Sequence, residues 1–364
     1  DVCSSDLERL RAAGVEPFAM SLQTALGVAE ADTAAALRAG HGDLGADARS
    51  ETTATVAGRI VLARRFGALT FLTVRDRTGD IQFVADRGNI GDAAFALLEE
   101  LDLGDIVGGR GVVGTTKRGE LSLFLTDVAL LTKALRPLPE KWHGLKDPDL
   151  QQRRRYLQLS SDVDSRRVVT ARAATLAAIR SHLNDSGFVE VETPVLHSHA
   201  GGAVARPFLT HHRVLDVELT LRIALELYLK RLLVGGLERV YEIGRNFRNE
   251  GIDRDHNPEF TMLEAYEAYG DYGTMMDLTE AILIAAAQAA GTPERFEWMG
   301  HTVNLTPPFR RAKYDDLLRE TTGCDPTEPA SVAAAAAGHG IETAGRHPDV
   351  VKSDLFEATV EKTQ

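Results

Sequence analysis

The order of hydrophobic and polar positions divides the chain into a strand-rich part and a mixed part. From Thr55 to about residue 131, short runs rich in β-branched and aromatic residues alternate with glycine-containing turns, which predicts strands. The runs cover residues 56–62, 69–75, 81–85, 106–114 and 121–125, and a helical pattern covers residues 92–101. This part is therefore expected to form five short strands with one helix between the third and the fourth.

Beyond residue 160 the periodicity changes. Apolar residues recur at steps of three and four over residues 165–186, which predicts a long amphipathic helix, and Gly187 stands where a helix C-terminus favours glycine. Strand-like runs follow at residues 188–191, 240–248 and 260–269, with a helical run at 223–233. This alternation predicts an α+β domain.

The number and order of the first five strands are typical of an OB-fold β-barrel, whose exposed face binds oligonucleotides. We therefore divide the chain into a leader (residues 1–54), an OB-fold domain (55–135), a linker (136–160) and an α+β domain (161–364). The leader is expected to be loosely tethered, because residues 29–50 are rich in Ala, Gly and Asp and show little periodicity. In the linker, Pro137, Pro139 and Pro148 break any regular element.

Composition narrows the class of protein. With 44% hydrophobic and 26% charged residues the chain is close to the globular norm, which excludes wholesale disorder. The formal net charge of −12 requires any nucleic-acid contact to be local. Two distant cysteines, Cys3 and Cys324, favour a reduced, cytoplasmic protein. The longest apolar run, residues 281–287, is far shorter than the roughly 18 residues that span a bilayer, so no membrane partner is expected.

Two patterns suggest sites that we reject. Gly109, Gly111 and Gly114 spell GxGxxG, but a polar turn and another strand follow, so no helix N-terminus is available for a pyrophosphate. Four histidines lack the spacing of a metal site, and we expect polar surface or supporting roles for them. They are His197, His199, His211 and His212.

The strongest chemical signal lies in residues 241–272. They read YEIGRNFRNEG, a polar loop and HNPEFTMLEAYEAY, which predicts two strands and a connecting loop. Because side chains alternate along a strand, each strand has one chemically rich face. The first carries Asn246, Arg248 and Glu250, and the second carries Phe260, Met262, Glu264 and Tyr266. If both face one cleft, a guanidinium that can hold a phosphate lies beside a ring that can stack on a purine. A solvated charged hairpin remains the alternative at this point.

This segment, with RNFRNEG and HNPEFTMLEAY, resembles motif 2 of the class II aminoacyl-tRNA synthetases in the form seen in the lysyl-tRNA synthetase family. GFVEVETPVL at residues 187–196 is similar to motif 1, which forms the homodimer interface in that class. Residues 130–159, 201–212 and 221–251 are also similar to this family. The resemblance implies an OB-fold anticodon-binding domain followed by a class II antiparallel-sheet catalytic domain.

The reaction that this resemblance implies joins L-lysine to tRNA(Lys) with ATP and Mg²⁺. In this family the lysine carboxylate attacks the α-phosphorus, and lysyl-adenylate then passes its acyl group to the tRNA 3′ end. Arg248 matches the catalytic arginine that binds the α-phosphate and the lysine carboxylate. Glu250 and Phe260 match residues that read and stack on adenine, and His256 and Asn257 lie in the loop that approaches the phosphates.

For lysine, the resemblance implies contacts from Gly202, Glu226, Glu264 and Tyr266 besides Arg248. Glu226 and Glu264 match the lysine-binding carboxylates, Tyr266 a hydroxyl partner of the side-chain ammonium, and Gly202 a backbone contact. Paired carboxylates reject a neutral isostere strongly, whereas losing one methylene costs only about 1–3 kcal/mol. We therefore expect the weakest discrimination against shorter diamino acids.

For the anticodon, the resemblance implies contacts from Arg64, Phe71, Gln82 and Glu120. Phe71 resembles the ring that stacks on an anticodon base, and the other three are candidate base or backbone contacts. A core position for Phe71 stays open as the alternative, because every other strand residue points inward.

Three features depart from the family. Leu225 stands where a proline usually precedes Glu226, and Ala265 replaces a usually larger residue after Glu264. A freer backbone and a cavity behind the sheet are the effects considered for these two changes, and we interpret both as tolerated variation. Nothing after Gly270 matches motif 3, a GxGxGxDR segment, and the family's Mg²⁺ ligands lie in that part, so no metal ligand is expected here.

The two ends of the sequence suggest an incomplete chain. It starts at Asp1 without a methionine or a signal-peptide pattern, and residues 352–364 resemble the helix before motif 3. We expect a chain cut inside the catalytic domain that makes little or no adenylate by itself. Two other functions stay open: the synthetase-like part of a fused lysyl-phosphatidylglycerol synthase, and an inactive RNA-binding paralogue.

Overall fold

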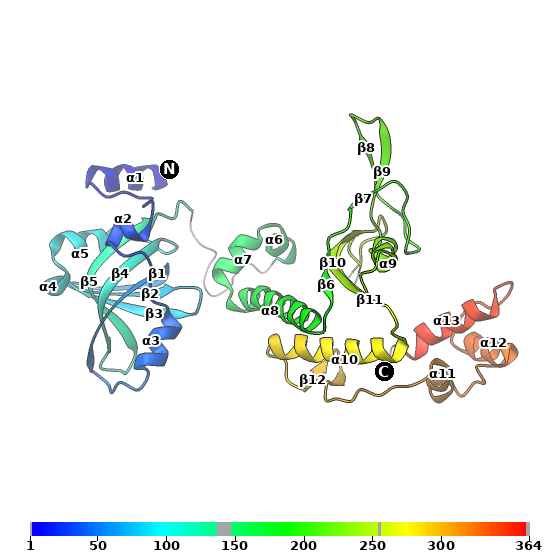
Figure 1. The fold of residues 1–364 in the computed structure, drawn as a ribbon. Coiled ribbons are helices and arrows are strands. Elements are labelled where there is room, and N and C mark those ends of the chain that lie inside the picture. Colours follow the sequence, from blue (N-terminus) through cyan, green and yellow to red (C-terminus); the bar gives the residue numbers. More distant parts are fainter. Residues whose placement is uncertain (1, 137–146, 254–255, 362–364) are drawn as a thin grey trace. The chain divides into compact units, whose positions relative to one another are not determined.

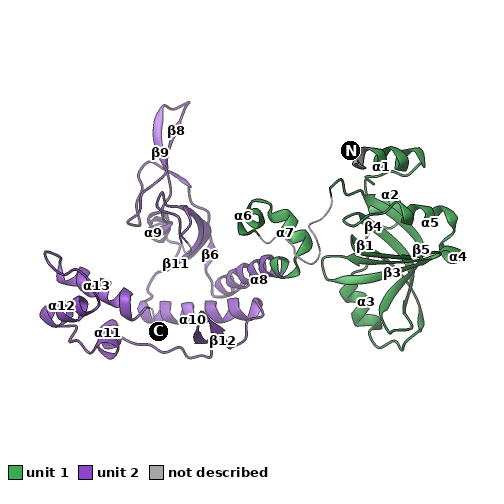
Figure 2. Cartoon of the chain, turned by 180° about the vertical axis from the view of Figure 1, so that it is seen from behind, with its two compact units in different colours: residues 1–166 green, residues 167–364 purple. Residues whose placement is uncertain are grey.

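The structure, a computed structural model, describes residues 2–136, 147–253 and 256–361 (Figure 1). The chain divides into two compact units, residues 1–166 and 167–364 (Figure 2). Helix α8 (Val163–Asp185), expected over residues 165–186, crosses this division. Two of the linker prolines, Pro137 and Pro139, lie outside the described residues, and the third, Pro148, begins helix α6 (Pro148–Arg153).

The first unit is built on a closed five-stranded β-barrel. Its strands are β1 (Arg49–Phe66), β2 (Leu69–Arg75), β3 (Asp80–Asp86), β4 (Ile106–Thr115) and β5 (Leu121–Thr132). Around the barrel they follow the order β1-β2-β3-β5-β4, and β1 closes it by pairing with both β2 and β4. Helices α4 (Arg87–Ile90) and α5 (Asp92–Glu99) lie between β3 and β4 in the chain. The predicted OB-fold barrel is confirmed.

Strand β1 begins well before the predicted run at residue 56. Its first residues, Arg49 to Thr53, are polar and mostly exposed, so they carry no hydrophobic alternation that a sequence pattern could detect. They join the sheet because β4 offers a long partner, with Arg49 opposite Gly114 and Thr53 opposite Val112. The strand assignment here comes from tertiary pairing and not from local preference.

The rejected glycine pattern has a packing explanation, because all three glycines lie inside β4. A Cβ on Gly109 would lie 2.6 Å from the Phe83 ring and 2.7 Å from a Leu125 methyl group. A Cβ on Gly111 would overlap the backbone of Phe124. Glycine is therefore required for close approach within the barrel and not for phosphate binding.

The expectation of a loosely tethered leader is wrong. Helices α1 (Val2–Ala12), α2 (Leu22–Leu26) and α3 (Ala34–His41) cover parts of the barrel. Leu10, Ala34 and Leu37 are at most 5% exposed and belong to the same core as the barrel interior. These apolar residues are widely spaced in the sequence, so periodicity missed them, but their side chains pack into the barrel core.

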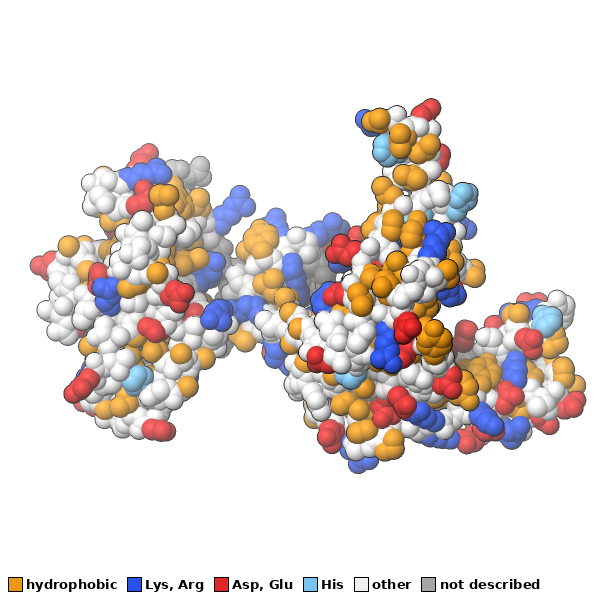
Figure 3. Space-filling model, viewed as in Figure 1, with side chains coloured by type: hydrophobic (Ala, Val, Ile, Leu, Met, Phe, Trp, Pro, Cys, Tyr) orange, Lys and Arg blue, Asp and Glu red, His pale blue; other side chains and the backbone are white. Residues whose placement is uncertain are grey.

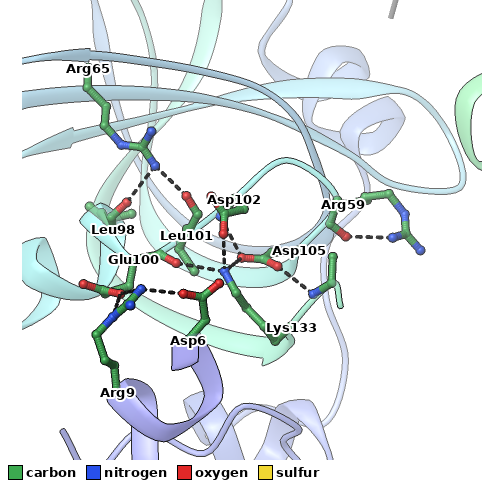
Figure 4. A network of polar contacts seen from close by, with 12 residues as sticks. Asp6, Arg9, Arg59, Arg65, Leu98, Glu100, Leu101, Asp102, Asp105 and Lys133 are labelled. Atoms are coloured by element: carbon green, nitrogen blue, oxygen red, sulfur yellow. Dashed lines mark hydrogen bonds and ion pairs between the residues drawn. The ribbon is translucent and has the colours of Figure 1, made fainter. Parts of the chain in front are cut away.

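A buried ion pair fixes the end of the barrel (Figure 4). Lys133, just after β5, is 3% exposed and lies 2.9 Å from the Asp105 carboxylate, which is fully buried, and 2.7 Å from Asp102. Its ammonium also donates to the Glu100 carbonyl at 2.9 Å, and Arg9 of α1 reaches the Glu100 side chain. These contacts tie α1, the turn before β4 and the exit of β5 together.

The second unit has a mixed sheet at its centre, which confirms the α+β prediction. Strands β6 (Val189–Glu190), β10 (Arg239–Phe247) and β11 (Glu259–Glu267) form a sheet in the order β11-β10-β6, with β10 and β11 antiparallel. A second sheet holds β7 (Leu196–His197), β9 (Val217–Leu221) and β8 (Leu209–His212), and β12 (Arg295–Trp298) pairs with β13 (His301–Asn304). The other helices of this unit are α9 (Glu226–Val234), α10 (Tyr272–Ala289), α11 (Tyr314–Thr322), α12 (Pro329–Gly338) and α13 (Pro348–Thr359), whereas α7 (Arg155–Ser161) belongs to the first unit.

Helices α11, α12 and α13 share a small apolar core of their own around Leu318, Ala336 and Leu355. In the part of the chain that the structure describes, no helix has the length and hydrophobicity needed to cross a membrane.

Replacing Lys133 by alanine is expected to lower the free energy of unfolding of the barrel by about 3–5 kcal/mol, because it leaves the Asp105 charge buried and unpaired. Burial lowers the pKa of Lys133, but hydrogen bonds and charge from Asp102 and Asp105 outweigh it and raise the pKa above 10.5. The wild-type pair therefore stabilises the fold below pH 10.5, and this contribution is lost as the pH rises through the folded-state pKa. Urea unfolding at pH 7 and above pH 10.5 measures both effects.

The matched control is Arg9→Ala, which removes the exposed arm of the same network. A change as large for Arg9→Ala as for Lys133→Ala would contradict the importance assigned to burial.

Candidate functional site

The register of β10 and β11 places the chemically rich residues on one face of the sheet. Asn246 lies opposite Phe260, and Glu242 lies opposite Glu264. Directly opposed residues of an antiparallel pair point to the same side. The solvated-hairpin alternative is therefore wrong, since Asn246 and Glu242 are at most 4% exposed.

The other face of this sheet packs against helices. Tyr241 and Phe188 form a core with residues of α8 and α10, including Leu183 and Ile282. Ala265, interpreted above as tolerated variation, packs against this core. With one face covered in this way, the Glu264 face is the one that can receive a ligand.

Arg248 and Phe260 lie together at one end of this face. The Arg248 guanidinium carbon is 5.1 Å from the centroid of the Phe260 ring, a cation–π arrangement. Arg248 follows β10 directly, and its backbone N–H donates to the Pro258 carbonyl at 2.9 Å, which carries the strand pairing one step further. The juxtaposition of a guanidinium and an aromatic ring that strand parity predicts is thus present in the structure.

The other three residues predicted at the nucleotide end are more exposed. Glu250 lies beyond the end of β10, and its carboxylate accepts the Arg206 backbone N–H at 3.3 Å beside a cavity of about 590 Å³. His256 pairs with Asp253 at 2.8 Å, away from the Arg248 pair. Asn257 is exposed in the same loop. The structure therefore brings Arg248 and Phe260 into contact, but not these three.

Four of the five residues predicted to bind lysine, all except Arg248, gather around the start of α9. The Glu264 carboxylate accepts the Leu225 backbone N–H at 3.0 Å on one oxygen and the Tyr266 hydroxyl at 2.9 Å on the other. Gly202, with φ of 87°, lies so close to Glu226 that a Cβ would be 3.1 Å from the Glu226 Cβ. Glu226 itself is bonded to Lys230 at 2.6 Å, one helical turn further on.

Tyr266 remains a neutral phenol in this environment. Burial, then its hydrogen bond to Glu264 and the charges of Glu264 and Glu226, raise the pKa of Tyr266 well above its ordinary value of 10. A protonated hydroxyl can donate to Glu264 while its oxygen still accepts from a cation. Two carboxylates and a neutral phenol together favour a positively charged ligand.

Leu225, interpreted above as tolerated variation, is well packed in the structure. Leu225 is 1% exposed, packs against Leu229 and Val240, and is the residue whose N–H holds Glu264. A proline at this position has no N–H to donate. The departure from the family therefore adds a contact to Glu264.

The sequence patterns did not reveal a buried ion pair beneath this face. Arg222 and Glu242 are at most 4% exposed and lie 2.6 Å apart. The second Glu242 oxygen accepts the Thr193 N–H and hydroxyl, and Arg222 also donates to the Arg245 carbonyl. Gly244 leaves the necessary space, because a Cβ there would overlap the guanidinium. Glu242 lies on the same face of its strand as Asn246, and this alternation was the sequence signal that could have placed Glu242 at the site.

The four predicted anticodon contacts line one cavity on the barrel, of about 900 Å³. Phe71 lies opposite Arg64 on β1, and the Arg64 guanidinium carbon is 5.9 Å from the Phe71 ring centroid. Leu72 and its alternate neighbours Thr70 and Val74 are buried, whereas Phe71 is half-buried. The core alternative for Phe71 is therefore wrong, since its ring lies on the outer face.

Gln82 and Glu120 differ in their availability. Gln82 is 8% exposed, and its amide already accepts from Arg64 at 3.1 Å and donates to Ser122 at 2.9 Å. Glu120 is exposed at the turn before β5. Before Gln82 can contact a base, its hydrogen bond with Arg64 or with Ser122 must therefore break or be shared with the base.

The described residues contain no group of three or more His, Cys, Asp or Glu that could hold a metal ion. His197 is 4% exposed, bonds the Pro194 carbonyl at 2.8 Å and lies against the Tyr228 ring. Burial lowers the pKa of His197, which keeps it neutral. His199, His211 and His212 are exposed. The described donors do not fit a Mg²⁺ site, which prefers several oxygen ligands.

Comparison with known families agrees with this geometry. Residues 147–343 match the family of tRNA synthetases class II (D, K and N), and residues 54–131 match the OB-fold nucleic acid binding domain. The chain therefore combines an OB-fold domain with the catalytic domain of the class II tRNA synthetases.

Individual relatives show to which family within this class the chain belongs. The chain is 46% identical over 360 residues to the lysine–tRNA ligase of Moorella thermoacetica, an alignment that covers 98% of this chain and 71% of the relative. It is 44% identical over 361 residues to that of Synechococcus sp. (strain CC9311), with 97% and 72% covered. The chain therefore belongs to the lysine–tRNA ligase family.

Replacing Arg222 by methionine is expected to lower the free energy of unfolding of the second unit by about 3–5 kcal/mol, because Glu242 then stays buried without a partner. The double variant Arg222→Met/Glu242→Leu is expected to recover most of the loss. Arg245→Ala, which breaks an exposed pair with Glu259 at 3.4 Å, is the control and is expected to cost less than about 1 kcal/mol. Urea unfolding followed by circular dichroism measures all three, and a double variant no better than Arg222→Met contradicts the explanation.

Proposed function

We propose that the protein is a lysine–tRNA ligase, which activates L-lysine with ATP to lysyl-adenylate and transfers the lysyl group to tRNA(Lys) in the cytoplasm. One observation carries this proposal: a single face of the sheet holds the Arg248–Phe260 pair at one end and the Glu264–Tyr266 pair at the other. Phe260 and Glu264 are four residues apart on one strand, roughly 14 Å at about 3.4 Å per residue. This length suits an amino acid joined to a nucleotide.

At the nucleotide end, the roles follow from charge and shape. The Phe260 ring offers a stacking surface for adenine, and the Arg248 guanidinium can compensate the charge that develops on the α-phosphate. A planar guanidinium also bonds a phosphate and the lysine carboxylate at the same time, which brings the two reactants together. ATP is a substrate in this reaction.

At the amino acid end, Glu264 and Glu226 supply the negative charge for the lysine ammonium groups, and Tyr266 supplies a neutral oxygen beside them. The two donors to Glu264 orient its carboxylate before the ligand arrives. Family membership implies Mg²⁺ in the reaction, but the described residues offer no fitting ligand set, so no step here is assigned to the metal.

The barrel is proposed to bind the anticodon loop through Arg64, Phe71, Gln82 and Glu120. Phe71 is the stacking ring, because it lies on the outer face with Arg64 beside it. Stacking together with hydrogen bonds to base edges is the usual way in which single-stranded RNA is read.

The protein is also proposed to form a homodimer through the motif 1 segment. Val168 and Val169 of α8 and Val189 of β6 are 48–57% exposed. Outside the motif 1 segment, on the β8–β9 hairpin visible at the upper right in Figure 3, Leu209, Val214 and Leu215 are also 66–88% exposed. Exposed apolar side chains in this number support a protein–protein contact.

The first test is lysine-dependent exchange of pyrophosphate into ATP, measured on the complete gene product and on residues 1–364 in parallel. Arg248→Ala is expected to abolish exchange in the complete product, because the charge on the α-phosphate loses its partner. Arg245→Ala, a nearby exposed arginine on the opposite face, is the control. Exchange by Arg248→Ala at the wild-type rate would refute the site. Residues 1–364 by themselves are expected to show little exchange, because they contain no match to motif 3.

Glu264→Gln is expected to weaken lysine binding chiefly, with a rise in KM of at least about tenfold and a smaller change in kcat, because a neutral amide replaces one carboxylate that faces an ammonium. The same exchange assay with varied lysine concentration separates KM from kcat. A lower kcat with unchanged KM would contradict the binding role.

A further inference from the structure

A second guanidinium–aromatic pair lies in the barrel cavity, besides Arg64 and Phe71. The guanidinium carbon of Arg49 is 3.2 Å from the centroid of the Phe124 ring, closer than Arg64 is to Phe71. Arg49 and Phe124 both line the 900 Å³ cavity that holds the predicted anticodon contacts. The function proposed above gives neither residue a role.

Arg49 is an exposed side chain that the backbone holds in place. Its Nη1 donates to the carbonyls of Ala48 at 3.1 Å and Thr115 at 2.9 Å. Gly114, directly opposite Arg49 in the β1–β4 pair, gives it room, because a Cβ there would lie 2.8 Å from the arginine Cδ. Long side chains lose conformational entropy when they are fixed, so an ordered exposed arginine needs compensation from its contacts.

The charge of Arg49 is not neutralised within the barrel. Among the residues that the structure describes, no carboxylate lies within ion-pair distance of its guanidinium, whereas Arg75 of the same unit pairs with one carboxylate and Arg9 with two. A fixed cation with an open plane, stacked on an aromatic ring, suits a nucleotide, because the plane can receive a base and the charge can meet a phosphate.

The pair is too far from Phe71 to serve the same base. Phe71 lies opposite Val84, and Val84 lies opposite Phe124 in the neighbouring strand pair. Phe71 and Phe124 are therefore two strand spacings apart, about 10 Å, on the same outer face. A base stacked on Phe71 cannot also stack on the Arg49–Phe124 pair, so this pair needs a nucleotide of its own.

We propose that Arg49 and Phe124 form a second nucleotide platform, which stacks an unpaired base of the same RNA loop that Phe71 contacts. This inference rests on the proposed binding of the anticodon loop by the barrel. A purely structural role, in which Arg49 only ties Ala48 to Thr115, is the competing explanation and predicts no effect on RNA affinity in a folded variant.

The test uses the full 364-residue chain and a fluorescently labelled anticodon stem–loop of tRNA(Lys), with affinity measured by anisotropy. Arg49→Lys keeps the charge but loses the plane, and Phe124→Leu keeps an apolar side chain but loses the ring. Each is expected to weaken binding about 5- to 150-fold, the range for one stacked base. Arg118→Ala, in the same cavity, is the charge control, and it is expected to reduce the salt dependence of RNA binding by about one ion. Arg49→Lys keeps the charge, so it should leave this salt dependence unchanged.

Phe71→Leu separates this inference from the function on which it rests. If Phe71→Leu weakens binding while Arg49→Lys and Phe124→Leu bind as the wild type does, the second platform is wrong and RNA binding by the barrel stands. If the wild type binds the loop no better than a stem–loop with a scrambled loop, both are wrong.

Abasic nucleotides give a readout that needs no protein variant. With the wild-type chain, removing single bases along the loop is expected to weaken binding at two or more positions, one for each platform. When the loop lacks the base that stacks on Phe124, the Phe124→Leu variant should bind it no more weakly than the wild-type chain does. When the loop lacks the base that stacks on Phe71, the same should hold for Phe71→Leu. The proposal would be overturned if only one abasic position weakened binding. It would also be overturned if, in folded variants, the loss of affinity from the substitution added to the loss from the missing base at every position.

Discussion

The candidate catalytic site depends on one constraint, the antiparallel register between β10 and β11. Because Asn246 pairs with Phe260 and Glu242 with Glu264, alternate residues of both strands project from the same face. A slip of β11 by one residue would turn Glu264 and Tyr266 toward the helices behind the sheet. The core around Tyr241 disfavours such a slip, since it would bring the Glu264 carboxylate into an apolar interior.

Below this face, a second constraint sets the position of the surrounding loops. The buried Arg222–Glu242 pair joins the segment before α9 to β10 and to Thr193 in motif 1. The start of α9 then reaches Glu264 through the Leu225 N–H. The residues proposed to bind lysine are far apart in sequence, and a buried charge pair and a backbone donor set their positions.

Sequence reasoning recovered the parts of the fold where burial alternates regularly. The five barrel strands and helix α8 follow from period-two and period-three-to-four patterns, and strand parity alone placed Arg248 near Phe260. Sequence reasoning failed where contacts between distant segments determine the secondary structure or the burial of a residue. The polar start of β1 is a strand because β4 pairs with it, and Leu10 and Leu37 are core residues in a segment without periodicity. The partners of Glu264 and Gln82 also depend on contacts between distant segments, which no local pattern encodes.

The closure of the barrel has a consequence for synthesis on the ribosome. All five strands lie before residue 133, and β1 pairs along both of its sides, so the barrel has no free edge. The first unit can thus satisfy all its strand pairing while the rest of the chain is still being translated. The nascent protein therefore exposes no unpaired barrel strand to neighbouring chains before β10 and β11 emerge.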